Sequence, residues 1–343
     1  MNPTRIRFLV AILTLPAILI PVSGLRAQPA TRPGEENILQ RRSQLAYVLL
    51  WKRDFDAACA EFRKVLAADP AQDEARLGLA LALERKGDLD AAEAEFGRVA
   101  AGGPQYAAAS AGRARILAAR GRFKEAVRLY EDLKAGGGLG DDFRLNYVET
   151  LAWDGQFDKA MTELAPLRNR EKMAAEVAKV EGQILAWSGR AAEAVPKLRQ
   201  ALEKSPEDDD LRIDLGRALW LSHRQDEAEE TLRGLTPRGA ASVKAALLRT
   251  DMLASARQYE PAIALVTAAL EKHPGNRDLR MRMAELLSWT QKYDQAVEVY
   301  RELLKSDPDD RRLHAKIGET LSWAGRFDEA AEHLRRALGE DKE

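Results

Sequence analysis

The chain has 343 residues and a formal net charge of -1, with 53 basic and 54 acidic residues. Because these charges are balanced and well mixed along the sequence, they exclude a global attraction to nucleic acid or to anionic lipid. The single cysteine, Cys59, excludes an internal disulfide framework, so side-chain packing must stabilise the fold.

Residues 1–27 have the layout of a secretory signal peptide. Arg5 and Arg7 precede an apolar run over residues 8–20, and Ala27 ends a plausible cleavage site. The run is shorter than the roughly 20 apolar residues that a transmembrane helix needs. We therefore expect export, cleavage after residue 27 and no stable membrane insertion afterwards; the alternative is a membrane anchor made by the uncleaved segment. Residues 28–38 predict a short flexible linker.

Beyond the linker, alanines recur with a period of 34 residues, and a large apolar residue follows four residues after each of them. This regularity over nine successive periods indicates a repeat architecture, in which each alanine packs where two helices cross. The alanines are Ala58, Ala92, Ala126, Ala160, Ala194, Ala228, Ala262, Ala296 and Ala330.

Each period predicts two helices joined by a short turn. In residues 277–310, the pattern predicts a first helix over 279–289, a turn at Gln291 and Lys292, and a second helix over 295–304 with one apolar stripe. An Asp-Pro pair then ends the second helix, because the residue before proline is pushed out of the helical region. No such pair can bury its apolar stripe alone, so neighbouring pairs must stack.

These residues resemble the tetratricopeptide-repeat (TPR) family, whose 34-residue unit combines small residues, an Ala-x-x-x-aromatic spacing and a closing proline. The resemblance implies an all-α fold, an α-solenoid wound as a right-handed superhelix of about nine helix-turn-helix units with a concave inner face. Early prolines, Pro166 and Pro237, predict that two second helices stop early and bend the superhelix. The solenoid spans 39–343, with repeats at 39–72, 73–106, 107–140, 141–174, 175–208, 209–242, 243–276, 277–310 and 311–343.

The resemblance also implies that positions 2, 5, 9, 12 and 13 of each repeat line the concave groove. Position 13 is tryptophan in five repeats, and polar residues with carboxyl or amide groups recur at position 9, on the same helix face. Two interpretations stay open: each tryptophan packs on the adjoining repeat, or the indoles form a ladder of exposed apolar platforms. The candidate groove residues are Trp51, Trp153, Trp187, Trp289, Trp323, Glu149, Gln183, Glu285 and Glu319.

The repeat variant is similar to TPR arrays of bacterial envelope and exopolysaccharide-export systems, which implies a periplasmic protein. We expect a non-enzymatic scaffold that docks envelope or outer-membrane proteins, possible polysaccharide contact, and no binding of nucleic acid. The alternatives are a glycan-binding module that uses the tryptophan ladder and a holdase for exported peptides. No capping helix follows the last repeat, so Leu334 and its neighbours are expected to meet a partner or a second copy.

The sequence predicts no catalytic centre, no metal site and no cofactor. The four histidines fall at four different repeat positions, and no pair has metal-ligand spacing on one helix face. The paired acids Asp141-Asp142 and Asp309-Asp310 precede first helices, where they are expected to cap helix N-termini.

Overall fold

The computed structural model describes residues 35–339, so the predicted signal peptide lies outside the described residues. Within this range the chain forms α-helices, labelled α1 to α19, with two short 3-10 helices and no strand. The helices divide into an N-terminal unit that ends at Met173 and a C-terminal unit that begins at Ala174. The division lies one residue before the end of the repeat expected at 141–174.

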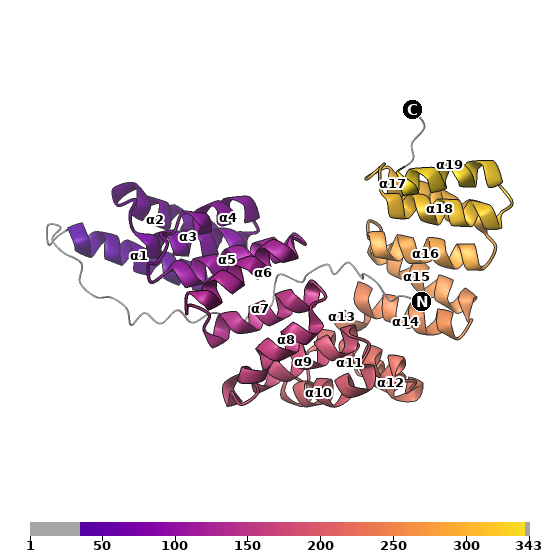
Figure 1. Ribbon diagram of the computed structural model, residues 1–343, viewed down its shortest axis with the longest axis horizontal. Helices are drawn as coiled ribbons and strands as arrows, with labels where there is room; N and C mark the ends of the chain where they lie inside the picture. Colours follow the sequence, from indigo (N-terminus) through magenta and orange to yellow (C-terminus); the bar gives the residue numbers. More distant parts are fainter. Residues whose placement is uncertain (1–34, 340–343) are drawn as a thin grey trace. The chain divides into compact units, whose positions relative to one another are not determined.

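The N-terminal unit stacks four helix pairs in chain order (Figure 1). Consecutive helices pack on one another, and the first helices of neighbouring repeats also touch, as α1 does with α3 and α5 with α7. Its elements are α1 (Glu35–Trp51), α2 (Phe55–Ala68), α3 (Asp73–Lys86), α4 (Leu89–Gly97), α5 (Tyr106–Ala119), α6 (Phe123–Ala135), α7 (Asp141–Trp153), α8 (Phe157–Leu164), η2 (Ala165–Leu167) and η3 (Glu171–Met173).

The C-terminal unit repeats this arrangement with five pairs and one extra turn of helix, α13. First helices again touch along the unit, α9 with α11, α11 with α14 and α14 with α16. Its elements are α9 (Ala174–Trp187), α10 (Ala191–Lys204), α11 (Asp209–Leu221), α12 (Gln225–Arg233), α13 (Pro237–Ala240), α14 (Val243–Ser255), α15 (Tyr259–Lys272), α16 (Arg277–Trp289), α17 (Tyr293–Leu304), α18 (Arg311–Trp323) and α19 (Phe327–Leu338). The all-α solenoid predicted from the sequence is therefore confirmed.

Small and large side chains interlock at every helix crossing. All nine periodic alanines are between 0% and 2% exposed. Where the large residue four positions later is phenylalanine, a glycine of the next first helix makes room: a Cβ on Gly78 would lie 2.4 Å from Phe62, and one on Gly112 would lie 2.5 Å from Phe96. Contacts this short show that the glycines are required for close packing of neighbouring repeats.

The turn inside each repeat has a left-handed residue at position 15. Glycine supplies it five times, at Gly87, Gly121, Gly155, Gly189 and Gly325. Arg53, His223, Arg257 and Gln291 adopt the same positive φ, between 58° and 66°, in the other four repeats. The turn geometry is therefore imposed by the packing of the two helices even where no glycine is present.

Two helix ends follow the early prolines, and three other helix boundaries differ from those that the sequence predicts. α8 and α12 end early, at Leu164 and Arg233, as predicted, and α4 also ends early, at Gly97. The expected linker 28–38 is shortened, because α1 begins at Glu35 and glutamate is a strong helix former. Asp310 caps α18 through the amides of Arg312 and Leu313, whereas α7 starts at Asp141 itself, after Gly140.

Candidate binding surface

The tryptophans at position 13 end the first helices of their repeats and differ in exposure. Trp51, Trp289 and Trp323 are 57%, 44% and 53% exposed, whereas Trp153 and Trp187 are half-buried. The surface that could offer apolar platforms is therefore concentrated at α1 and at α16 and α18.

Two of these tryptophans also pack against the preceding repeat. The ring centroids of Trp153 and Phe123 lie 6.3 Å apart, and those of Trp289 and Tyr259 lie 6.2 Å apart. Each partner is the aromatic residue that starts the second helix of the repeat before. Trp289 thus packs on Tyr259 while 44% of it stays exposed, so packing on the adjoining repeat and exposure occur together at this residue. A spacing of 30 residues between the two aromatic positions is the signal that sequence reasoning missed.

Polar residues at position 9 contact neighbours both on their own helix and on the next first helix. The Gln183 amide donates to Asp214 at 2.7 Å. Arg282 donates to Glu285 at 2.8 Å, and the Lys316 ammonium lies 3.9 Å from Glu285. Glu149 is half-buried on α7. Among the candidate carboxylates, Glu319 is the exposed one, 3.5 Å from Lys316.

Together these side chains form a row of alternating charge along the first helices of the C-terminal unit, which we call the charge ladder. It consists of Arg217, Asp251, Arg282, Glu285, Lys316 and Glu319, joined by contacts of 3.9, 2.7, 2.8, 3.9 and 3.5 Å in that order. The three positive and three negative charges balance. The ladder therefore presents no net charge to a ligand.

Burial makes two carboxylates on or beside this surface harder to ionise. Burial raises the pKa of the Asp251 carboxyl, while the guanidinium groups of Arg282 and Arg217 lower it. Burial likewise raises the pKa of Asp214, which the Gln183 hydrogen bond opposes. These carboxylates are costly to ionise in place, so their role is to join neighbouring first helices, and they are poorly available to a ligand.

The N-terminal unit has a different polar contact at the same level. Arg115 on α5 binds Glu84 on α3 with two hydrogen bonds, of 3.2 and 2.8 Å, and both side chains are about a tenth exposed. A bidentate buried pair of this kind fixes the spacing of two first helices. It leaves little free polar capacity for a partner.

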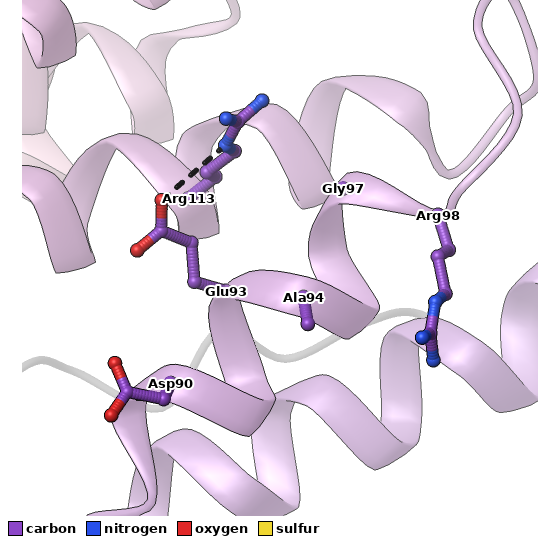
Figure 2. Close-up of a pocket in the computed structure, with 6 residues that line it drawn as sticks. All are labelled: Asp90, Glu93, Ala94, Gly97, Arg98 and Arg113. Carbon is purple, nitrogen blue, oxygen red and sulfur yellow. Dashed lines mark ion pairs between the residues drawn. The ribbon is translucent and has the colours of Figure 1, made fainter.

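A shallow pocket of about 440 Å³ lies between α4 and α5. Figure 2 shows Glu93 directed toward Arg113, with their charged atoms 3.7 Å apart, and Arg98 on the far side. The lining residues are Asp90, Glu93, Ala94, Gly97, Arg98 and Arg113. They offer neither a nucleophile nor a set of metal ligands, so the pocket gives no chemical function by itself.

One histidine pair was not expected from the sequence. His314 on α18 and His333 on α19 meet across the last repeat with their Nδ1 atoms 2.9 Å apart. Within residues 35–339, no group of three or more histidine, cysteine, aspartate or glutamate side chains is placed to hold a metal ion. In the same range no helix has the length and apolar character required to cross a membrane.

The fold and this open surface define an α-solenoid built from stacked helix pairs. The family model for the tetratricopeptide repeat matches residues 49–116, 86–137, 187–251 and 253–320, which together are more than half of the chain. The chain therefore belongs to the tetratricopeptide-repeat family. This fold generally serves as a non-catalytic scaffold for protein-protein interaction.

Solved structures show the same fold. A tetratricopeptide repeat protein from Parabacteroides merdae is similar with a TM-score of 0.60 at 12% identity, over 73% of this chain and 98% of that chain. The human IFIT1 dimer with m7Gppp-AAAA is similar with a TM-score of 0.56 at 17% identity, over 88% and 72%. At these identities the likeness concerns the fold alone. No curated protein matches the chain.

Proposed function

We propose that this protein is a non-enzymatic scaffold that holds an extended segment of a partner protein on the first helices of its C-terminal unit. The observation that carries the proposal is the equivalent exposure of Trp289 and Trp323, one repeat apart on α16 and α18. Two indoles at the same register offer apolar platforms at the spacing of one repeat. Exposed aromatic side chains that become buried in a complex often supply much of the binding energy of a protein interface.

The charge ladder narrows the chemistry of the partner. Because its charges balance, it favours a segment with apolar side chains and few charges, and it adds one acceptor, Glu319, for a basic residue or a backbone amide. A polyanion finds no excess of positive charge on this row. For that reason the RNA present with IFIT1 is not part of the proposal for this chain.

The proposed setting is the bacterial cell envelope. Its support is the signal-peptide pattern of residues 1–27 and the resemblance to repeat arrays of polysaccharide-export systems. On this proposal the exported protein works in the periplasm, where it supports the assembly or export of surface polysaccharide or outer-membrane components. The alternative is attachment to the membrane by the uncleaved segment. Mass spectrometry of the isolated protein decides, because cleavage predicts an N-terminus at Gln28.

The scaffold proposal is tested by partner capture from solubilised cell envelopes. The double variant Trp289→Ala and Trp323→Ala is expected to lose the partners that the wild-type chain retains, because both platforms are removed. Tyr106→Ala, an exposed aromatic residue of the N-terminal unit, is the matched control and should retain them. Equal capture by the double variant and the wild type would contradict the proposal.

A glycan ligand is the second candidate, favoured by the same exposed indoles next to Glu285 and Glu319. Sugar rings stack on flat aromatic faces, and carboxylates accept hydrogen bonds from hydroxyls. A soluble β-1,4-glucan oligosaccharide should then shift the tryptophan emission of the wild type and leave the emission of the double variant unchanged. A holdase, the third candidate, would instead suppress aggregation of unrelated unfolded proteins, a property that light scattering measures directly.

Also part of the proposal is self-association through the last repeat. Its support is the exposure of apolar side chains along α19, where Phe327 is 70% and Leu338 is 67% exposed.

A further inference from the structure

The last helix exposes side chains that every other repeat covers. At position 24 the eight preceding repeats have a large residue that is at most 3% exposed, whereas Leu334 is 36% exposed. At position 17 the aromatic residues of earlier repeats, such as Phe123 and Tyr259, are half-buried, whereas Phe327 is 70% exposed. These side chains of α19 occupy the positions on which a following first helix packs.

The first helix exposes the reciprocal surface. At position 7, Leu79, Leu215 and Ile317 are buried, whereas Leu45 at this position of α1 is 47% exposed. Position 10 is likewise buried at Ile116, whereas Val48 is 53% exposed. Trp51, at position 13, is 57% exposed. Each of these side chains lies where a preceding repeat would cover it.

The internal junctions show which contacts such a pair of surfaces makes. A tryptophan at position 13 packs on the aromatic residue at position 17 of the repeat before, as Trp153 does on Phe123. One residue further along, a base at position 14 pairs with an acid at position 18 of the repeat before. Lys86 pairs in this way with Asp56, and Arg120 pairs with Asp90.

We propose that α1 of one copy of this chain docks on α19 of a second copy, in the register by which each repeat stacks on the one before. This places Trp51 against Phe327 and Lys52 against Asp328, at the positions of the internal pairs. Lys52 and Asp328 are both exposed. The aromatic contact and the ion pair thus match at adjacent positions, which is why a second copy is the occupant and not an unrelated partner.

The consequence is a head-to-tail assembly. The two surfaces differ, so the contact is heterologous: each copy uses α1 toward one neighbour and α19 toward the other. A symmetric contact between two α19 helices would leave the exposed side chains of α1 uncovered. Copies joined head to tail would continue the 34-residue stacking from one chain into the next.

The test uses the protein as isolated from cells that express the full chain, with mass measured by sedimentation and light scattering over a range of concentrations. The wild type should associate. Phe327→Glu and Val48→Glu each change an exposed side chain, so folding is retained, and each should weaken association tenfold or more. Arg63→Glu, an exposed residue of α2, is the control and should associate as the wild type does.

Mixing the two variants separates head-to-tail from symmetric contact. The chain with Phe327→Glu retains a working α1, and the chain with Val48→Glu retains a working α19, so an equal mixture should form dimers and stop there. Lys52→Asp or Asp328→Lys alone should weaken association about twofold to fivefold, the range for an exposed ion pair, and the two changes in one chain should restore it. Circular dichroism confirms that each variant is folded.

Three outcomes would overturn the proposal. A wild type that stays monomeric at every concentration has no second copy on α19. Association that survives Val48→Glu shows that α1 takes no part. A mixture of the two variants that stays monomeric excludes the head-to-tail contact. This inference rests on the self-association part of the proposed function, which a monomeric wild type would also remove. Capture of partners at Trp289 and Trp323 is measured separately, so its failure is distinguishable from failure of the head-to-tail contact.

Discussion

His314 and His333 meet Nδ1 to Nδ1 at 2.9 Å, at the two positions where other repeats have an ion pair. The equivalent residues are Arg42 with Glu61, Arg76 with Glu95, and Arg144 with Glu163. The other ring nitrogen of His314 lies 2.9 Å from the carbonyl oxygen of Pro308, so this nitrogen donates. A neutral His314 then accepts at Nδ1 from His333, and both rings are held in defined tautomers.

This pair predicts that the last repeat is weakened by acid. Burial lowers the pKa of His333, and the electrostatic effects of His314, Arg301 and Arg336 lower it further, while Glu332 raises it. A lowered pKa means that the unfolded chain binds the proton more readily than the folded one. The contribution of this histidine to stability is therefore fully present above pH 6.5, its ordinary pKa, and is lost as the pH falls through its pKa in the folded state. Hydrogen-exchange protection factors of α19 should fall between neutral pH and pH 5.

The control for this prediction is a variant that retains a hydrogen-bond donor at position 333 and removes the titrating imidazole. His333→Gln can still donate to His314, and it should flatten the loss of protection with pH. His223→Gln changes an exposed histidine in the turn between α11 and α12 and should leave the pH dependence as it is in the wild type. If α19 is equally protected at both pH values in the wild type, the pair is not a source of pH dependence.

The glycines that contact phenylalanine rings predict that even one added methyl group destabilises the fold. Gly112→Ala places a methyl group 2.5 Å from the Phe96 ring and should destabilise the N-terminal unit by about 1–3 kcal/mol. Urea unfolding followed by circular dichroism measures the cost. Because the clash is with the outer ring atoms, Phe96→Leu should relieve it, and the double variant should cost less than the sum of the two single changes.

Gly97→Ala is the matched control. Gly97 ends α4 with a negative φ, and a Cβ there meets no atom within 4 Å, so the change should be neutral or stabilise by about 0.4–1 kcal/mol. Equal destabilisation by Gly97→Ala and Gly112→Ala would show that loss of glycine itself, and not the Phe96 contact, sets the cost.

Asp214 predicts a stabilising substitution. Its nearby cations are engaged by other acids: Lys244 binds Asp210, and Lys179 lies 3.1 Å from Asp208. Burial raises the pKa of Asp214, so its charge is a cost at neutral pH. Asp214→Asn should therefore raise the free energy of unfolding at pH 7 by on the order of 1 kcal/mol. The raised pKa also fixes the sign: the gain should disappear as the pH falls toward 3.8.

The control for Asp214 is Asp210→Asn. Asp210 and Lys244 are each half exposed, so loss of this ion pair should change stability by less than about 1 kcal/mol. Unfolding in urea at several pH values gives both comparisons. A gain at Asp214 that is constant with pH would show that the benefit does not come from removing a buried charge.

The sequence was sufficient for the helix pairs because their signal is local and repeated. Ala296 and Tyr300, four residues apart, specify one stripe of one helix, and eight further copies of this spacing make the same prediction. The start of α1 at Glu35 was missed because the first helix extends beyond the repeat period, where the 34-residue pattern has no information.

The contacts of the candidate surface were harder to predict from the sequence. Position 9 was interpreted on its own helix, whereas Glu285 is held by Lys316 from the next first helix. The partners of Trp289 and His314 also come from other helices, at spacings of 30 and 19 residues. Such spacings acquire meaning only when the register between helices is known. Once the repeat frame is fixed, they can be read from the sequence of any further repeat in the array.

The left-handed turns lead to a final prediction. Gln291 has φ of 62° and an exposed side chain, and a non-glycine residue in this conformation costs about 1–2 kcal/mol. Gln291→Gly removes that cost but gives the unfolded chain more freedom, so the net gain should be about 0.5 kcal/mol. The reverse change in the next repeat, Gly325→Gln, meets no atom within 4 Å and should destabilise by about 1 kcal/mol through the backbone alone. Thermal and urea unfolding of the two variants measure opposite shifts if the conformation is imposed by helix packing. Shifts of the same sign would mean that the side chains, and not the turn backbone, determine the stability of these repeats.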